Sequence, residues 1–296
     1  MGFVTAEELY GRDSNLKRDD VKILQEWMDK EQHLPKITEV SLLFFLHSCY
    51  YKIEATKTCI ENYFTIRLHC PEFFKNQNPK DKDVEQQLRL LCMTVLPKKT
   101  KENYSVMITR LIDSSPEFYD YNNQIKVIDM VGTLTLMQRG PSDGQAMIMD
   151  SEGFGFAHMM KANLTSSRKH LTFVQEALPI RLKAIHIVNV SPTTEKFLGI
   201  LKPFIKKELF DMIHLHRTPE GLHDYINKDD LPNEYGGKLG SFKELHQEML
   251  KNVTENMDFF VQNEKLVADE SKRQGKPKNM GDIFGIEGTF KKLDID

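Results

Sequence analysis

Residues 146–150 read AMIMD and residues 184–190 read AIHIVNV. Both runs are short and apolar, which is typical of buried strands. Between them Leu171, Val174 and Leu178 recur at helical spacing, after Ser166 or Ser167 as a cap for the start of the helix. A strand, a helix and a second strand in this order predict parallel strands joined by a right-handed crossover, and therefore an α/β fold.

The same alternation continues on both sides of this unit. Residues 106–111 and 212–216 predict two more strands. A second crossover helix is expected to begin after Ser191-Pro192, and Pro203 should bend or shorten it. Its apolar face consists of Phe197, Leu201, Phe204 and Ile205. The central part of the chain therefore predicts a mixed sheet flanked by helices.

The two ends of the chain have a different pattern. Residues 1–95 predict a helical domain, because three apolar faces recur at helical spacing. These faces are Val21, Leu24, Trp27 and Met28; Leu42, Leu43 and Leu46; and Ala55, Cys59, Tyr63 and Ile66. Residues 96–103 resemble a domain junction, so residues 96–240 form the predicted α/β domain and residues 241–296 a carboxy-terminal helix and tail. From Ala268 the tail is polar and is expected to cross the surface loosely, with Phe284-Gly285 and Phe290 docking back.

The composition limits the partners and the compartment. Among 296 residues, 40 Lys and Arg nearly balance 43 Asp and Glu, so the net charge of −3 attracts neither nucleic acid nor an anionic membrane as a whole. No apolar run approaches the ~20 residues of a membrane helix, and the first residues lack the pattern of a secretory signal. The four cysteines form no CxxC pair, which favours a reducing compartment. We expect a soluble, cytoplasmic protein with no nucleic-acid partner.

Motifs of enzymes are incomplete in this chain. Gly153-Phe-Gly155 follows a strand, but His158 occupies the third position of a dinucleotide-binding motif. His214 and His216 share one strand face without a third metal ligand nearby. Asp150 and Glu152 have neither a nucleophile nor a metal beside them, so capping and hydrogen bonding are the expected roles. We therefore expect no catalytic activity, no metal and no cofactor.

Apolar side chains gather around the end of the strand at residues 146–150. They are Met147, Met149, Phe154, Phe156, Met159 and Met160. Methionine makes a soft wall that adapts to irregular ligands, and ligand pockets are mostly apolar. Ordinary core packing is the alternative, and the pattern alone leaves both open.

Several motifs together resemble the CRAL-TRIO family. In the amino-terminal part they are LLFFL at 42–46, IEA at 53–55 and ENY at 61–63. In the central part they are MDSEGF at 149–154, QEALPIR at 175–181, IHIVN at 185–189, KPF at 202–204, IHLH at 213–216 and LPNEYGG at 231–237. The ending FGIEGTF at 284–290 is similar to insect members related to the tocopherol and retinaldehyde carriers. The resemblance implies a helical amino-terminal domain packed on a lipid-binding α/β domain with an apolar cavity and a helical lid.

The resemblance also implies a ligand site. The lid would be residues 197–210. The expected cavity and lid residues are Met147, Met149, Phe154, Phe156, Ala157, His158, Met160, Val174, Leu178, Ile187, Phe197, Leu201 and Phe204. Ala157 stands where the family's tocopherol carrier has a hydroxyl residue, which argues against tocopherol as the ligand. Candidate polar anchors are His158, Tyr119 and Thr135.

A basic cluster beside the lid is implied in the same way. Arg181 and Lys183 match the first basic pair of the family's phosphoinositide site, while Glu208 and Met212 replace the second pair. Lys206 and Lys207 lie close in sequence and are expected to compensate in part. The predicted function is a carrier that binds a tocopherol, retinoid, carotenoid or related lipid and touches membranes transiently to transfer it. The alternative is a membrane adaptor that reads phosphoinositides and moves no cargo.

Overall fold

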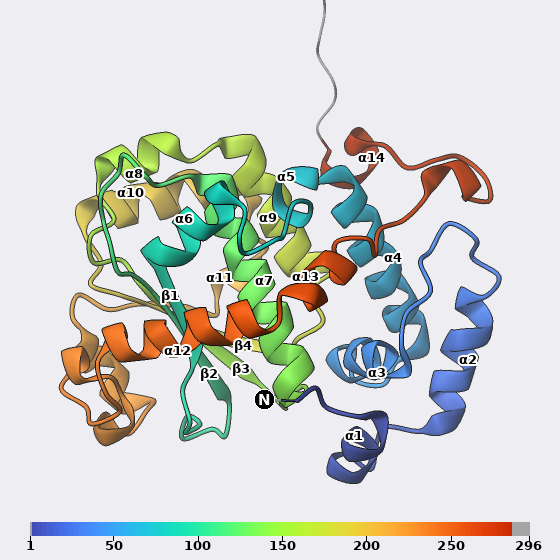
Figure 1. Cartoon of the computed structure of the whole chain (residues 1–296), viewed down its shortest axis with the longest axis horizontal. Helices are drawn as coiled ribbons and strands as arrows, with labels where there is room; N and C mark the ends of the chain where they lie inside the picture. Colours follow the sequence, from blue (N-terminus) through green and yellow to red (C-terminus); the bar gives the residue numbers. More distant parts are fainter. Residues whose placement is uncertain (1, 286–296) are drawn as a thin grey trace, which may run out of the picture.

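A computed structural model of the chain describes residues 2–285. Its centre is a five-stranded sheet with the strands side by side in chain order, β1 to β5 (Figure 1). The strands are β1 (Leu91–Val95), β2 (Ser105–Leu111), β3 (Gln145–Asp150), β4 (Leu182–Val188) and β5 (Ile213–Leu215). β2 to β5 are parallel and β1 is antiparallel to β2, so the prediction of a mixed sheet is confirmed.

Strand β1 corrects the expectation of helices up to residue 95. Helix α6 (Lys82–Leu90) runs directly into β1, and Met93 pairs with Thr109 of β2. Leu91, Cys92 and Met93 are all buried, because other parts of the protein cover both faces of β1. A continuous apolar run of this length does not distinguish a buried strand from the end of a buried helix.

Three crossover helices connect the parallel strands. They are α7 (Tyr121–Arg139), α9 (Leu164–Glu176) and α10 (Pro192–Leu201). Helix α9 begins earlier than expected, because Asn163 rather than a serine caps it by accepting a hydrogen bond from the backbone N–H of Ser166. Helix α10 begins after Ser191 as predicted, and the chain tightens to a 3-10 turn, η1 (Lys202–Phe204), at Pro203.

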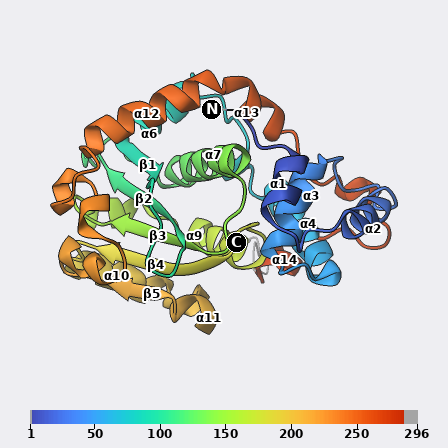
Figure 2. The same ribbon diagram turned by 90° about the horizontal axis from the view of Figure 1, so that it is seen from below.

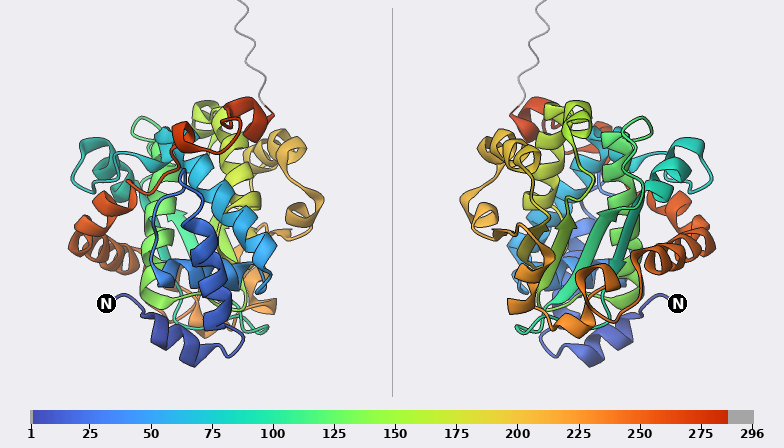
Figure 3. Two further views of the ribbon diagram at one scale, coloured as in Figure 1. Left: turned by 90° about the vertical axis from the view of Figure 1, so that its right-hand side faces the viewer. Right: turned by 90° about the vertical axis from the view of Figure 1, so that its left-hand side faces the viewer.

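The first five helices pack at one end of the sheet, in front of it in the left panel of Figure 3. They are α1 (Ala6–Arg12), α2 (Arg18–Met28), α3 (Glu39–Ser48), α4 (Ile53–His69) and α5 (Pro71–Phe74), whereas α6 packs against α7 and β1. Leu24, Leu42 and Ile66 from the predicted apolar faces are buried. Their core also contains Phe173 of α9, so the amino-terminal helices and the sheet-bearing part share one hydrophobic cluster. The division at residues 95 and 240 stays a prediction.

The carboxy-terminal part wraps back over the molecule. Helices α12 (Phe242–Glu255) and α13 (Met257–Asn263) run along the edge of the sheet beside β1 (Figure 2). The following segment is tied down and does not cross the surface loosely, because backbone N–H groups of Ala268 and Asp269 donate to the carbonyls of Phe64 and His33. After η5 (Glu270–Lys272), helix α14 (Met280–Phe284) buries Phe284 as predicted. Phe290 lies outside the described residues.

Candidate functional site

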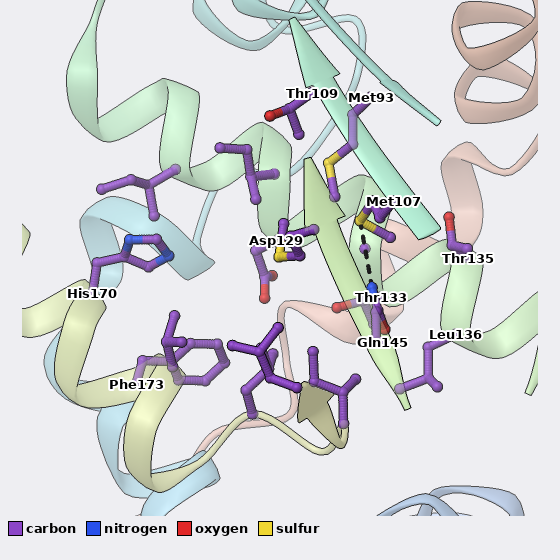
Figure 4. A pocket seen from close by; sticks show the side chains of 18 of the residues that line it. Met93, Met107, Thr109, Asp129, Thr133, Thr135, Leu136, Gln145, His170 and Phe173 are labelled. Atoms are coloured by element: carbon purple, nitrogen blue, oxygen red, sulfur yellow. Dashed lines mark hydrogen bonds between the residues drawn. The ribbon is translucent and has the colours of Figure 1, made fainter. Parts of the chain in front are cut away.

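A cavity of about 1090 Å³ lies between one face of the sheet and the helices α7, α9 and α10, with the amino-terminal helices closing its end. Figure 4 shows part of its wall. The lining is mostly apolar. Eight of the predicted cavity and lid residues line it: Met147, Met149, Phe154, Val174, Leu178, Ile187, Phe197 and Leu201.

The alternation of side chains along the strands produces the floor of this cavity. In β3 the accessible residues are Gln145, Met147 and Met149, whereas the residues between them are buried. Strand side chains alternate between two faces, so one face of β3 opens on the cavity and the other is packed. The packed face meets Leu222, Leu231 and other residues of the turns after β5, which are η2 (Pro219–Asp224), η3 (Lys228–Asp230) and η4 (Asn233–Tyr235).

Methionine is prominent on the cavity face. Met93 on β1, Met107 on β2 and Met147 on β3 come from three adjacent strands and all line the cavity. Met149 continues the row, with 42% of its surface accessible. The flexible thioether side chain adapts to the shape of a ligand. Met147 and Met149 thus lie in the wall of a cavity, and their contact with a ligand stays a prediction.

Five predicted residues do not line the cavity. Phe156, Ala157, His158 and Met160 lie on the short helix α8 (Phe156–Lys161). Gly153, whose φ of +79° favours glycine, lies in the turn between β3 and α8, and Phe154 is the last residue before α8 that lines the cavity. Phe204 instead borders a smaller hollow between the end of the lid, α4, α9 and α14.

Two of the three candidate polar anchors face the cavity. Tyr119 and Thr135 line it, and burial raises the pKa of Tyr119. His158 has another role, because its Nδ1 accepts a hydrogen bond of 3.1 Å from the backbone N–H of Gly155 and so caps α8.

The titratable residues in the wall that the sequence analysis did not predict include Asp129 of α7 and His170 of α9. A carboxylate oxygen of Asp129 accepts a hydrogen bond of 3.2 Å from Gln77 and lies 3.6 Å from the guanidinium of Arg67. Burial raises the pKa of Asp129, and the charge of Arg67 opposes that shift. His170 is enclosed without a charged neighbour, and burial lowers its pKa to about 4. Helical spacing could have found His170, which lies four residues before Val174.

The segment predicted as a lid covers one side of the cavity. Helix α10 turns Phe197, Leu198 and Leu201 toward it, and Phe197 packs on Phe154 with ring centroids 5.5 Å apart. After η1 comes the short helix α11 (Lys207–Phe210). Gln175 of α9 holds the end of the lid with two hydrogen bonds, donating to the carbonyl of Phe204 at 3.2 Å and accepting from the N–H of Lys206 at 2.6 Å.

The structure brings Arg181 and Lys183 together beside Tyr50, as expected for two residues on the same side of a strand. The Arg181 side chain is buried, donates to the carbonyl of His47 at 2.8 Å and lies 4.2 Å from the ring centroid of Tyr50. Lys183 donates to the Tyr50 hydroxyl at 2.8 Å. Lys206 and Lys207 are exposed on the lid and form ion pairs with Glu176 and Asp211.

The strand-end carboxylates have structural roles, as expected. Asp150 accepts hydrogen bonds from the Tyr235 hydroxyl at 2.6 Å, Asn189 at 2.8 Å and Arg110 at 3.0 Å, and Glu152 pairs with Arg110 at 2.7 Å. A buried carboxylate with this many donors is fully satisfied. It locks the end of β3 to β2, to the residues after β4 and to η4.

The strand histidines also pack as a structural group. His186 of β4 contacts His216 through ring nitrogens 3.0 Å apart and stacks on His214 with centroids 5.0 Å apart. Tyr225 covers His186 at 4.3 Å. Within residues 2–285 no group of three or more His, Cys, Asp or Glu side chains has the arrangement of a metal site. No helix in that range is both long and apolar enough to cross a bilayer.

Two protein-family models match this chain. A family model described as CRAL/TRIO domain matches residues 73–237, and one described as Pinta-like, UBA domain matches residues 13–84. Proteins named alpha-tocopherol transfer protein-like from Mus musculus and Homo sapiens are each 27% identical over 226 residues. That match covers 75% of this chain and 65% of each relative, so the chain spans just under two thirds of their length.

Two further matches are more limited. Clavesin-1 of Xenopus laevis is 32% identical over 98 residues, which are 33% of this chain and 30% of that protein. A solved structure described as the crystal structure of Sfh5 aligns with a TM-score of 0.48 at 13% identity, covering 80% of this chain and 97% of that one.

Proposed function

The chain belongs to the CRAL/TRIO domain family, and we propose that it is a carrier that binds a small hydrophobic ligand in the cavity and transfers it to or between membranes. The lid, residues 197–210, opens and closes over the ligand. The observation that carries this proposal is the apolar cavity of about 1090 Å³, which lies under an amphipathic segment. Two hydrogen bonds with Gln175 hold the end of that segment in place. The transfer includes no covalent chemistry.

Burial of a ligand against the apolar wall of the cavity provides enough free energy for tight binding. If a ligand buries about 400 Å² of apolar surface, the gain is ~10 kcal/mol at ~25 cal/mol per Å². Part of this is lost to the restricted motion of the bound ligand. The names of the relatives suggest a tocopherol-like cargo, and a retinoid, carotenoid or related lipid suits the same wall. The chain would work in the cytoplasm, with peripheral and transient membrane contact.

A membrane contact is proposed for the outer side of the lid and for α8. Phe156 and Met160 of α8 are 58% and 66% exposed, and Ile200 on the outer face of α10 is 42% exposed. Lys196 of α10 lies 5.9 Å from the ring centroid of Phe156, so basic and apolar groups alternate on this surface. Such a mixture is typical of segments that lie in a membrane interface.

Phosphoinositide recognition is proposed at Lys183, with Arg181 contributing its charge from beneath Tyr50. Lys183 is half-buried and donates to a neutral phenol, and no acid among residues 2–285 forms an ion pair with it. Lys206 and Lys207 supply further positive charge once their exposed ion pairs exchange with phosphate. Vesicles with and without a phosphoinositide, tested with Lys183→Ala, would measure this contribution.

The carrier function is tested by transfer of a fluorescent retinoid or tocopherol analogue from donor to acceptor vesicles. Ile200→Asp should slow transfer several-fold without changing the affinity for the analogue in solution, because Ile200 points away from the cavity. Glu195→Gln is the matched control on the same helix, since it removes only an exposed ion pair with Arg217.

A second pair of variants tests the lid. Gln175→Leu removes both hydrogen bonds to the end of the lid and should accelerate release of the analogue, while Thr172→Ala, one turn earlier on α9, should not. If the wild-type chain binds vesicles but moves no analogue, the carrier proposal is wrong and the adaptor alternative is favoured.

A further inference from the structure

His170 occupies a position in the cavity that apolar residues otherwise hold. It lies on α9 four residues before Val174 and eight before Leu178, and all three line the cavity. Its ring packs against Phe73 of α5 with centroids 6.2 Å apart. Figure 4 shows the imidazole projecting from α9 toward the interior, on the same side as Phe173 and Asp129.

Neither ring nitrogen of His170 has a hydrogen-bond partner among residues 2–285, and the ring contacts Phe73 edge-on. Buried polar groups in folded proteins are nearly always paired, and a neutral imidazole offers one donor and one acceptor. The part of the ring that protein atoms leave uncovered faces the cavity. The hydrogen-bond partner of His170 must therefore belong to a molecule that occupies the cavity.

The residues around His170 determine whether the ligand group that contacts its ring is charged or neutral. Burial lowers the pKa of His170 to about 4, so the ring is neutral at physiological pH. Asp129, an acid in the same wall, is already engaged by Gln77 and Arg67. Arg181, one of several cations in the wall, donates to the His47 carbonyl and packs on Tyr50. Burial alone lowers the pKa of His170, with no contribution from a charged side chain among residues 2–285, so a ligand carboxylate beside its ring would be desolvated without a counter-charge, which is costly.

We propose that His170 is the polar anchor of the ligand, and that the cavity selects an uncharged lipid bearing one hydroxyl or carbonyl group. This inference rests on the proposed carrier function and specifies its cargo. A hydroxyl group can donate to one ring nitrogen, and a carbonyl oxygen can accept from the protonated one. The cavity volume of about 1090 Å³ allows a large ligand, since at roughly 30 Å³ for a water-sized group it holds a few dozen non-hydrogen atoms.

The test uses four retinoids with one carbon skeleton: the alcohol, the aldehyde, the carboxylic acid and the hydrocarbon. Binding of each to the full chain is measured by equilibrium titration. The wild type should bind the alcohol and the aldehyde more tightly than the acid and the hydrocarbon. His170→Phe should weaken the alcohol and the aldehyde roughly ten-fold, which corresponds to about 1.4 kcal/mol, and leave the hydrocarbon unchanged.

Two more variants keep the result interpretable. His170→Gln retains a donor and an acceptor and should preserve the preference for the alcohol, which a purely structural role of the ring would not predict. Val174→Ile, one turn along the same face, changes the shape of the wall without a polar group and should affect all four ligands alike. If His170→Phe does not fold, His170→Leu, which also removes both ring nitrogens, takes its place and should lose the preference for the alcohol that His170→Gln keeps.

The outcomes separate this inference from the proposed function. If His170→Phe keeps the wild-type ratio of alcohol to hydrocarbon affinity, the anchor is wrong while the carrier function stands. If the acid binds most tightly, the inference is overturned and Arg181 becomes the polar contact. If the wild type binds none of the four and transfers none between vesicles, the proposed function fails together with the inference.

Discussion

Gly132 of α7 offers a way to fill part of the cavity from the middle of a helix. It lines the cavity, and a Cβ added to it would meet a single atom within 4 Å, the terminal methyl of Met93 at 3.6 Å. That is an ordinary contact with the flexible end of a side chain. We predict that Gly132→Leu stabilises the ligand-free protein and lowers its capacity for large ligands.

The expected magnitudes follow from two contributions. Replacing a helical glycine by alanine or leucine gains about 1 kcal/mol of stability. Placing the leucine side chain against the apolar wall adds roughly 1 to 2 kcal/mol, less than full burial because the cavity leaves part of it open. The four added carbons occupy on the order of 120 Å³ at roughly 30 Å³ each, about a ninth of the cavity of about 1090 Å³.

The assay combines thermal unfolding with ligand titration. Gly132→Ala should raise Tm by about 2 °C and Gly132→Leu by about 4 to 6 °C, at about 2 °C per kcal/mol for a chain of this size. Only Gly132→Leu should weaken a ligand that fills the cavity, and it should spare a shorter one. Gly11→Ala in the exposed helix α1, where no atom lies within 4 Å of an added Cβ, controls for helix propensity. A loss of stability in Gly132→Leu, or unchanged binding of the largest ligands, would refute the description of this wall.

Three further predictions concern buried polar groups and thiols. Tyr235→Phe should destabilise the fold by ~1.5–3 kcal/mol in denaturant unfolding, because it removes a donor from the buried carboxylate of Asp150; equal stability would show that the carboxylate is satisfied without it. Cys49 should be the first thiol alkylated by iodoacetamide, with a rate that rises as the pH passes about 7, since a hydrogen bond with Cys59 lowers the pKa of Cys49 to about 7; peptide mass spectrometry locates the label. Burial lowers the pKa of both His170 and His186 to about 4, so the unfolded chain takes up protons first and stability should fall between about pH 6.5 and 4. Unfolding of His170→Phe over this range should show a shallower slope, and an identical slope would contradict the burial of His170.

The elements that could be predicted are those whose pattern is local. The runs at 146–150 and 184–190 became β3 and β4 because their length and apolar content admit few other structures. The start of α10 at Ser191-Pro192 was also visible, since its cap and first turn are neighbours in sequence. Strand β1 was not, because its buried run of residues has no period of its own and follows a helix without a break.

The candidate site was predictable only on the sheet and the crossover helices. Met147 and Ile187 follow from the alternation of a strand, and Val174 from the spacing of a helix, once one face is known to be open. The α8 residues were misplaced, because the direction of the chain after Gly153 depends on a backbone turn that composition does not reveal.

By itself, then, the sequence determined the order of strands and helices, their apolar faces and the family motifs, since each of these depends on residues within one or two turns of each other. Only the tertiary structure decided that one sheet face is left unpacked, that Arg181 is buried under Tyr50 and that His170 has no partner within the described residues. Each of these facts depends on the distance in space between segments that are far apart in the sequence. A cavity is the absence of a contact between elements, and no local pattern of side chains records it.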